Sequence, residues 1–169
     1  MYEFFTPKPT TLEELKGQYR KLAMAHHPDR GGDTEVMKAI NAEYDRLFPL
    51  LKDVHQKKDG ERYTSREPSA ETAEHFKALI DQLMRMDAIT IEVIGCFVWV
   101  TGDTKPHRAQ LKALKFQWHS KKLAWYLAPE DYRKRSRKDY ALDEIRGMYG
   151  TSGQMNSKGI VKIEQATTA

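Results

Sequence analysis

The stretch Tyr19-Arg20-Lys21-Leu22-Ala23-Met24-Ala25-His26-His27-Pro28-Asp29-Arg30-Gly31-Gly32-Asp33 decides how the N-terminal part of this chain folds. A basic amphipathic segment leads into the tripeptide His27-Pro28-Asp29. The proline disfavours helical backbone at the residue before it, so it predicts that a helix stops there. The pair Gly31-Gly32 predicts a turn, after which Asp33 or Thr34 can cap a second helix.

Apolar residues on both sides of this loop recur at helical spacing, which predicts one amphipathic helix before it and one after it. The two stripes are Leu12, Leu15, Tyr19, Leu22 and His26, and then Val36, Met37, Ile40, Tyr44 and Leu47. A threonine, Thr10 or Thr11, can cap the first helix, and Pro49 predicts that the second ends at Phe48. Two such helices can bury their stripes against each other, so we expect an antiparallel helical hairpin.

Residues 2–51 resemble a J domain, the signature of DnaJ-type co-chaperones. Glu14-Leu15-Lys16 and Tyr19-Arg20-Lys21-Leu22-Ala23 match the usual second helix, and Met37-Lys38-Ala39-Ile40-Asn41-Ala42-Glu43-Tyr44 matches the third. The resemblance implies that the loop and the basic helix dock on the ATPase domain of a DnaK-type heat-shock chaperone and accelerate its ATP hydrolysis. It implies these docking residues: His27, Pro28, Asp29, Lys16, Arg20 and Lys21.

The docking hypothesis makes two geometric demands. Lys16, Arg20 and Lys21 fall off the apolar stripe and are expected to face outward, where they would steer encounter with an acidic partner. The loop, stiffened by its proline, is expected to point outward as well. The alternative of a metal site at His26, His27, Asp29 and Asp33 matches no common zinc spacing, so we expect no metal and no cofactor.

Composition limits the remaining possibilities. The chain has 169 residues with 40% hydrophobic and 31% charged content, which is typical of a globular protein. It has one cysteine, no apolar run long enough for a membrane span and no secretory signal at its start. We therefore expect a cytoplasmic protein. The Gly/Phe-rich segment and cysteine-rich zinc region of a full-length DnaJ do not follow the hairpin.

The rest of the chain predicts a small α+β domain. A polar linker spans residues 52–68, and Ser69 caps a helix over about 70–86. We expect its apolar stripe to pack on the following sheet, and the alternative is a helix that binds a partner or dimerises. The remaining predicted elements are one long strand over 89–101 with a bulge or bend at Gly95, a helix from Thr104 to about Leu114, a hairpin over 116–128, a last helix over 139–149, and a loose tail from 151 in which residues 160–163 could add a strand.

The predicted fold class is therefore α+β, an N-terminal all-α helical hairpin followed by a small β-α-β-β domain with flanking helices. The predicted division is residues 1–51, the linker 52–68, a C-terminal module over 69–150 and a tail over 151–169. This module loosely resembles one that follows J domains in short bacterial, plasmid and phage proteins.

Positive charge gathers in the C-terminal half, where residues 104–138 hold eleven Lys and Arg against two acids. This asymmetry favours a polyanionic partner, nucleic acid or a nucleoprotein complex. The possible nucleic-acid-binding residues are Lys105, Arg108, Lys112, Lys115, Lys121, Lys122, Arg133, Lys134 and Arg135. Interleaved aromatics could stack on bases, although Trp99, Trp118 and Trp125 are expected to be core residues because they lie in predicted strands.

The sequence thus favours a non-enzymatic adaptor. Its hairpin recruits and stimulates a DnaK-type chaperone, and its basic module directs that chaperone to a target. One alternative is a nucleic-acid-binding protein of a phage or plasmid with a vestigial J-like hairpin. A second is a cell-cycle protein, because His27-Pro28-Asp29-Arg30-Gly31-Gly32-Asp33 also resembles the J domains of viral tumour antigens. The Leu-x-Cys-x-Glu motif of those antigens does not occur in this chain.

Overall fold

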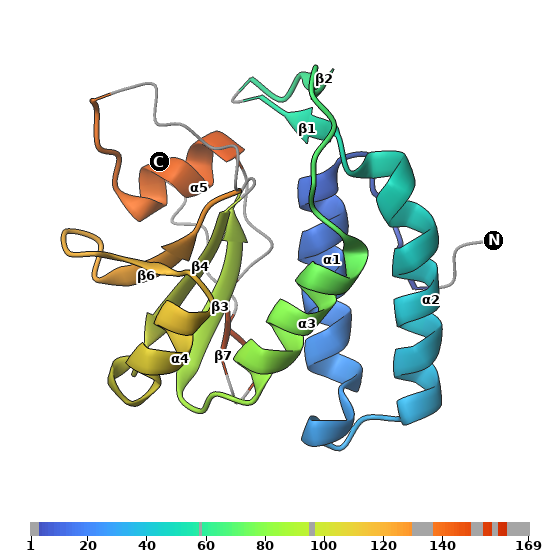
Figure 1. Cartoon of the computed structure of the whole chain (residues 1–169), viewed down its shortest axis with the longest axis horizontal. Helices are drawn as coiled ribbons and strands as arrows, with labels where there is room; N and C mark the ends of the chain where they lie inside the picture. Colours follow the sequence, from blue (N-terminus) through green and yellow to red (C-terminus); the bar gives the residue numbers. More distant parts are fainter. Residues whose placement is uncertain are drawn as a thin grey trace, which may run out of the picture.

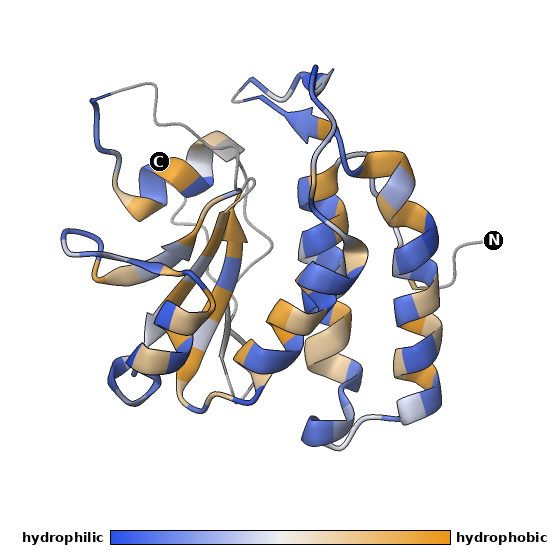
Figure 2. Cartoon of the chain, in the orientation of Figure 1, coloured by the Kyte–Doolittle hydropathy of each residue, from blue (hydrophilic) through white to orange (hydrophobic). Residues whose placement is uncertain are grey.

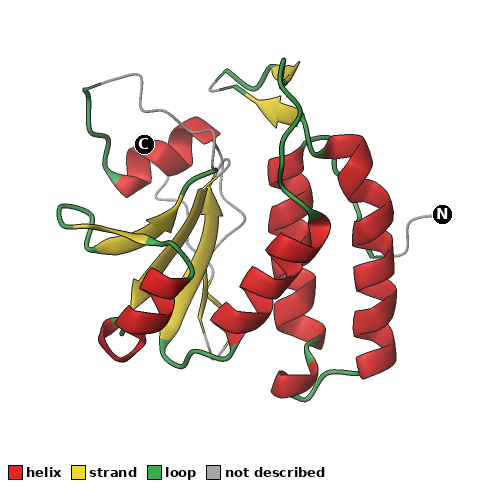
Figure 3. Cartoon of the chain, in the orientation of Figure 1, coloured by secondary structure: helices red, strands yellow, loops and turns green. Residues whose placement is uncertain are grey.

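The computed structural model describes residues 4–57, 59–94, 97–129, 137–149, 154–156 and 159–161. Its fold is α+β, as predicted: three helices lie together on one side of the molecule and a mixed group of strands and short helices on the other (Figures 1 and 3). No helix in these ranges is both long and apolar enough to cross a membrane.

The predicted helical hairpin is confirmed. Helix α1 (Leu12–His26) begins after Thr11, whose hydroxyl accepts a hydrogen bond from the Glu14 amide. Helix α2 (Thr34–Leu51) begins after Asp33, whose carboxylate accepts one from the Glu35 amide. Its predicted end at Phe48 is wrong by three residues. The helix continues past Pro49 because the Lys52 amide reaches back to the Phe48 carbonyl at 2.8 Å.

Within the predicted polar linker, strands β1 (Val54–Gln56) and β2 (Arg62–Thr64) form a two-stranded antiparallel sheet. Helix α3 (Ala73–Met84) follows, and Thr72 rather than Ser69 caps it by accepting from the His75 amide. Its apolar stripe packs on the hairpin, where the Phe76 ring contacts Tyr19 and Tyr44. The prediction of packing on the following sheet therefore missed this contact with α1 and α2.

The predicted single strand over residues 89–101 is wrong. Strands β3 (Ile89–Ile94) and β4 (Phe97–Gly102) are antiparallel neighbours, with Ile94 opposite Phe97. The two residues between them, including Gly95, lie outside the described part of the chain. The predicted helix after Thr104 is a 3₁₀ turn, η2 (Lys105–His107), followed by the short α4 (Arg108–Ala113).

The larger sheet has the strand order β5-β6-β4-β3-β7-β8. The predicted hairpin is confirmed as β5 (Gln117–His119) paired with β6 (Ala124–Leu127). Helix α5 (Leu142–Tyr149) matches the predicted last helix apart from its start. Strands β7 (Gln154–Asn156) and β8 (Gly159–Val161) extend the sheet beyond β3, so the predicted loose tail contributes two strands.

Alternation along the strands gives the sheet two covered faces. One face joins the main apolar core, which continues into the helical hairpin without interruption. The opposite face carries Ile94, Trp99 and Ala124, against which Leu142 and Ile145 of α5 pack. Figure 2 shows the apolar stripes of α1, α2 and α3 and of the strands. The division into separate domains stays a prediction, and the hairpin and the sheet share one core.

Candidate functional site

His27 joins the first helix to the loop and is held by both. Its amide donates to the Ala23 carbonyl at 2.9 Å, and its own carbonyl accepts from the amides of Arg30 and Gly32. Pro28 opens a single 3₁₀ turn, η1 (Pro28–Arg30). The imidazole Nδ1 accepts from the Asp29 amide at 3.2 Å, so Nε2 carries the ring proton. The loop is therefore rigid, as its proline predicts.

The two glycines after the turn are required by its geometry. Gly31 has a φ of +80°, a left-handed conformation that side chains rarely adopt. Gly32 has an ordinary φ, but a Cβ there would overlap the backbone of His26. The turn from α1 into α2 thus favours glycine at position 31 for its φ and requires glycine at position 32 for the close approach of His26.

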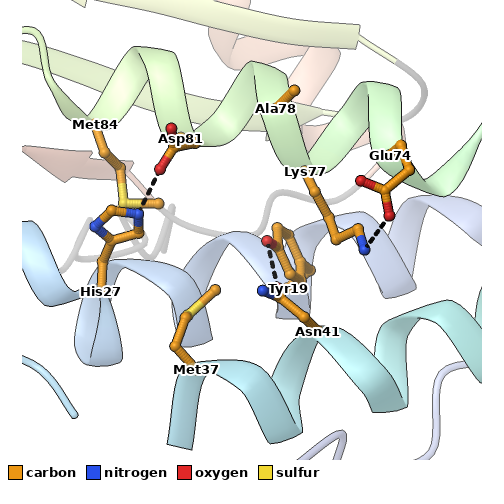
Figure 4. A pocket seen from close by; sticks show the side chains of 9 residues that line it. All are labelled: Tyr19, His27, Met37, Asn41, Glu74, Lys77, Ala78, Asp81 and Met84. Atoms are coloured by element: carbon orange, nitrogen blue, oxygen red, sulfur yellow. Dashed lines mark hydrogen bonds and ion pairs between the residues drawn. The ribbon is translucent and has the colours of Figure 1, made fainter. Parts of the chain in front are cut away.

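The imidazole of this loop does not point outward, which corrects the sequence prediction. His27 is only 9% exposed, and its Nε2 lies 2.6 Å from the Asp81 carboxylate of α3 (Figure 4). Pro28 and Asp29 behave differently, since both are exposed. Half of the Asp29 side chain is accessible, and Arg85 approaches it only to 3.6 Å. The tripeptide is thus divided into a covered imidazole and an accessible proline and carboxylate.

Lys16 was expected to face outward and is instead buried. Its Nζ lies 2.5 Å from the Glu71 carboxylate, just before α3, and 4.9 Å from the centre of the Phe76 ring. The prediction assumed that α1 packs on α2 alone, which would leave the opposite face of α1 in solvent. It failed because α3 also packs on α1.

Arg20 departs further from the prediction, since it is completely buried. Its guanidinium donates to the carbonyl of Ile91 in β3. Burial lowers the pKa of Arg20 to about 10, and the charge of Glu92 opposes that shift. Lys21 alone of the three cations is exposed, as predicted. Burial, and then the neighbouring charge of Arg20, lower the pKa of Lys21.

The residues that cover this face, above all Glu71 and Asp81, were not predicted from the sequence. A signal for them exists in the spacing. Lys16 of α1 and His27, the residue that directly follows α1, are eleven positions apart. Their acidic partners, Glu71 just before α3 and Asp81 within it, are ten positions apart. At 1.5 Å per residue of helix each interval is about 15 Å, so two hydrogen-bond donors and two acids at matched intervals are compatible with a parallel pairing of α1 and α3.

The C-terminal basic residues form a more accessible surface. Lys105, Arg108, Lys112 and Lys115 are all exposed, and none forms an ion pair with any residue in the described ranges. The single helical face predicted for them does not form, because η2 precedes α4 and Lys115 lies beyond it with a φ of +67°. Arg108 and Lys112 do share one helix face, four residues apart.

At the tip of the β5–β6 hairpin the structure corrects the predictions for Trp118 and Lys122. Trp118 was expected to be a core residue and is 47% exposed, whereas Trp99 and Trp125 are buried. Lys122 is nearly covered, since its Nζ lies 2.5 Å from the Asp139 carboxylate. Lys121 stays exposed, 3.7 Å from the same carboxylate. Lys122 is thus unsuited to hold a phosphate. Arg133, Lys134 and Arg135 lie outside the described residues.

A histidine-proline-aspartate loop between two antiparallel helices is the arrangement of a J domain, and the sequences of known proteins agree. The N-terminal region is similar to a chaperone protein dnaJ A6 of Oryza sativa subsp. japonica, with 42% identity over 50 residues, and to a DnaJ protein homolog 2 of Allium porrum, with 50% over 40 residues. A chaperone protein DnaJ of Acetobacter pasteurianus is 36% identical over 56 residues.

These matches cover 29%, 24% and 33% of this chain, but only 12%, 10% and 15% of the respective relatives. They concern the hairpin and leave the C-terminal module without a comparison. No family model matches the chain, and no solved structure matches it.

Proposed function

We propose that this protein is a J-domain co-chaperone that docks on the ATPase domain of a DnaK-type chaperone and accelerates its ATP hydrolysis. The observation that carries the proposal is the rigid His27-Pro28-Asp29 loop, set in the region that is similar to DnaJ proteins. The Asp29 carboxylate can accept charge-assisted hydrogen bonds from a partner arginine or from backbone amides. Lys21 adds an exposed positive charge that favours encounter with an acidic surface.

In this proposal the imidazole of His27 first holds the loop and then contributes to docking. Its Nδ1 fixes the Asp29 amide, which orients the neighbouring carboxylate. Its Nε2 proton, now donated to Asp81, is the group that a chaperone would have to take over. Docking through His27 and Lys16 therefore requires their partners next to and within α3 to move aside.

The test is the steady-state ATP turnover of purified DnaK as the concentration of this protein is raised. We expect stimulation that saturates, and we expect His27→Gln to abolish it. Asp29→Asn should also abolish it and is the safer variant, because this exposed carboxylate has only long ionic contacts. His26→Gln is the matched control, since it changes the neighbouring imidazole outside the docking set. Equal stimulation by all four proteins would refute the proposal.

We further propose that the C-terminal module directs the chaperone to a target and that the chain itself catalyses no reaction. A cytoplasmic location fits this role, because that is where a DnaK-type partner would meet it. Nucleic acid or a nucleoprotein complex is the second candidate for what this module binds. The observations in its favour are the exposed cations of this module and the exposed side chain of Trp118, which is available for stacking.

Retention of labelled single-stranded DNA and RNA over a salt series tests this second function. Phosphate recognition requires that affinity falls steeply as salt rises. Trp118→Ala should weaken binding, and Tyr63→Ala, another exposed aromatic on the separate β1–β2 hairpin, is its control. Binding that ignores salt, or no binding at low salt, would exclude nucleic acid as the target.

A further inference from the structure

The face of α1 that carries the proposed docking residues is occupied by another part of the same chain. We propose that α3, together with Glu71, is an intramolecular lid that competes with the chaperone for this face. The inference rests on the proposed docking function and adds its regulation. In the closed molecule Lys16 and His27 are covered, and the chaperone can engage them only in the fraction of molecules in which α3 has moved away.

The lid is attached at two charged points with an aromatic contact between them. At one end Glu71 pairs with Lys16 at 2.5 Å. At the other end Asp81 accepts from His27 at 2.6 Å. Between them Phe76 is 2% exposed and packs on the Tyr19 and Tyr44 rings, with centroids 6.0 and 6.2 Å away. The two acids thus supply the same negatively charged partners for Lys16 and His27 that an acidic chaperone surface would supply.

A further ion pair ties the lid to the second helix of the hairpin. Lys77 of α3 lies 2.7 Å from the Asp45 carboxylate of α2 and 2.6 Å from Glu74 within its own helix. The lid therefore spans both helices of the hairpin. Neither Asp45 nor Lys77 belongs to the proposed docking set, so this pair can be altered without changing the docking residues.

The packing at the edge of the lid is incomplete. A pocket of about 250 Å³ that opens to solvent lies between α1, α2 and α3, and His27, Asn41, Lys77 and Asp81 contribute polar groups to its lining (Figure 4). An interface interrupted by a partly polar, open pocket gains less from burial than a continuous apolar one. Such an interface is suited to opening without unfolding the hairpin and the sheet on either side of it.

A metal site is the alternative use of the same cluster. Ligand atoms of His27, Asp29 and Asp81 lie within 4.8 Å of one another. Arg85, however, already supplies the positive charge, with Nη2 3.0 Å from Asp81 and Nε 3.6 Å from Asp29. A cation would have to displace this guanidinium, so the geometry favours an ionic latch over a metal centre.

Arg20 is not among the residues that the proposed lid covers. Its guanidinium is held by the Ile91 carbonyl of β3, which belongs to the sheet and not to α3. Displacement of α3 would expose Lys16 and His27 and leave Arg20 covered. We therefore assign Arg20 to the joint between hairpin and sheet, although the family resemblance places it among the docking residues.

The first test opens the lid by removing its charges while their shapes are kept. The double variant Glu71→Gln/Asp81→Asn should lower the concentration for half-maximal stimulation of DnaK by about tenfold, since it raises the open fraction. Glu74→Gln is the matched control, because this acid of α3 contacts Lys77 and none of the docking residues. Hydrogen exchange should show faster exchange of the α3 amides in the double variant and not in the control.

The second test locks the lid. Asp45→Cys and Lys77→Cys, in a background with Cys96→Ser, place two thiols on α2 and α3 where an ion pair now joins them. A short bis-maleimide should bridge them and suppress stimulation of DnaK at least tenfold. The same protein treated with a monofunctional maleimide serves as its own control and should retain its activity.

The outcomes separate the two proposals. If bridged and unbridged proteins stimulate DnaK equally, and the double variant matches the wild type while His27→Gln is inactive, the lid is refuted and docking stands. Faster hydrogen exchange of the α3 amides without any gain in stimulation of DnaK would also refute the lid and leave the docking function standing. If even the opened variant leaves ATP turnover unchanged, the docking function fails, and the lid fails with it.

Discussion

The two basic surfaces of this molecule differ in what lies opposite them. On α1, Lys16 is paired with Glu71, just before α3, and Arg20 donates to a carbonyl of β3. On η2 and α4, the side chains of Lys105, Arg108 and Lys112 are exposed. The same residue types therefore serve different purposes. A covered cation holds defined partners at defined distances, whereas an exposed cation adds to a general field that attracts polyanions.

This difference has a consequence for function. The exposed surface is accessible at all times, and its affinity for a partner depends on the salt concentration. The covered surface is accessible only when another segment has moved, so its apparent affinity depends on a conformational equilibrium. A protein that recruits a chaperone to a target benefits from both properties, since the target can be held continuously while the chaperone is engaged conditionally.

The largest contrast between the two surfaces is expected in stability. Arg20→Ala should lower the free energy of unfolding by about 3 kcal/mol, because it leaves the Ile91 carbonyl without its buried donor and opens a cavity. Arg108→Ala on the exposed surface should change it by less than about 0.5 kcal/mol. Urea unfolding followed by circular dichroism measures both. Equal midpoints for the two variants would mean that Arg20 is not a structural residue.

A double-mutant cycle sharpens the comparison at a single ion pair. Lys16 and Glu71, with side chains 7% and 21% exposed, should show a coupling free energy of about 1–2 kcal/mol. Lys38 and Glu35, which are 66% and 79% exposed on α2, should couple by only about 0.3 kcal/mol. Coupling of the same size in both pairs would show that α3 does not seat firmly on α1.

Salt dependence tests the exposed surface. If the module binds duplex DNA through α4, Arg108→Gln/Lys112→Gln should reduce the slope of log affinity against log salt by about 2, since each phosphate contact contributes roughly 0.9. Lys16→Gln should leave the slope unchanged, because that cation already has a partner. Fluorescence anisotropy gives the slopes. An equal loss from both substitutions would contradict the division into covered and exposed cations.

The smallest effect is a local dependence on pH at the β5–β6 hairpin. The hydrogen bond from Lys122 holds the pKa of Asp139 below its usual 3.8. A lowered carboxylate pKa means that the pair persists at pH 4 and is lost only as the pH falls through the lowered value. The carboxyl carbon shift of Asp139 reports this by NMR. Lys122→Met should raise the pKa markedly, and Lys121→Met, at the longer contact, should raise it much less.

Much of the hairpin could be predicted because its signals are local. The caps, the proline in the loop and the two apolar stripes each act within a few residues. Of the capping residues offered, Thr11 and Asp33 serve, and both stripes apart from His26 lie in or against the core. The β5–β6 hairpin and α5 follow from equally local patterns. The predicted end of α2 at Phe48 was wrong although its signal, Pro49, is local. A backbone hydrogen bond from the Lys52 amide to the Phe48 carbonyl spans the proline, and the helix continues to Leu51.

The rest depends on contacts between segments that are far apart in the sequence. Nothing near Lys16 or His27 indicates that an acid 55 or 54 positions away will cover it. Strands β3 and β4 were taken for one long strand because β-branched and aromatic residues continue on both sides of Gly95. The docking tripeptide itself was found from the sequence, but whether its imidazole is accessible depends on where α3 packs.

The most direct test of the account compares DnaK ATP turnover with the opened protein Glu71→Gln/Asp81→Asn, with and without the further change His27→Gln. The account predicts that the opened protein stimulates at about one tenth of the wild-type concentration and that His27→Gln abolishes this stimulation. If the opened protein stimulates equally well without the imidazole, the face beneath α3 is not where the chaperone docks.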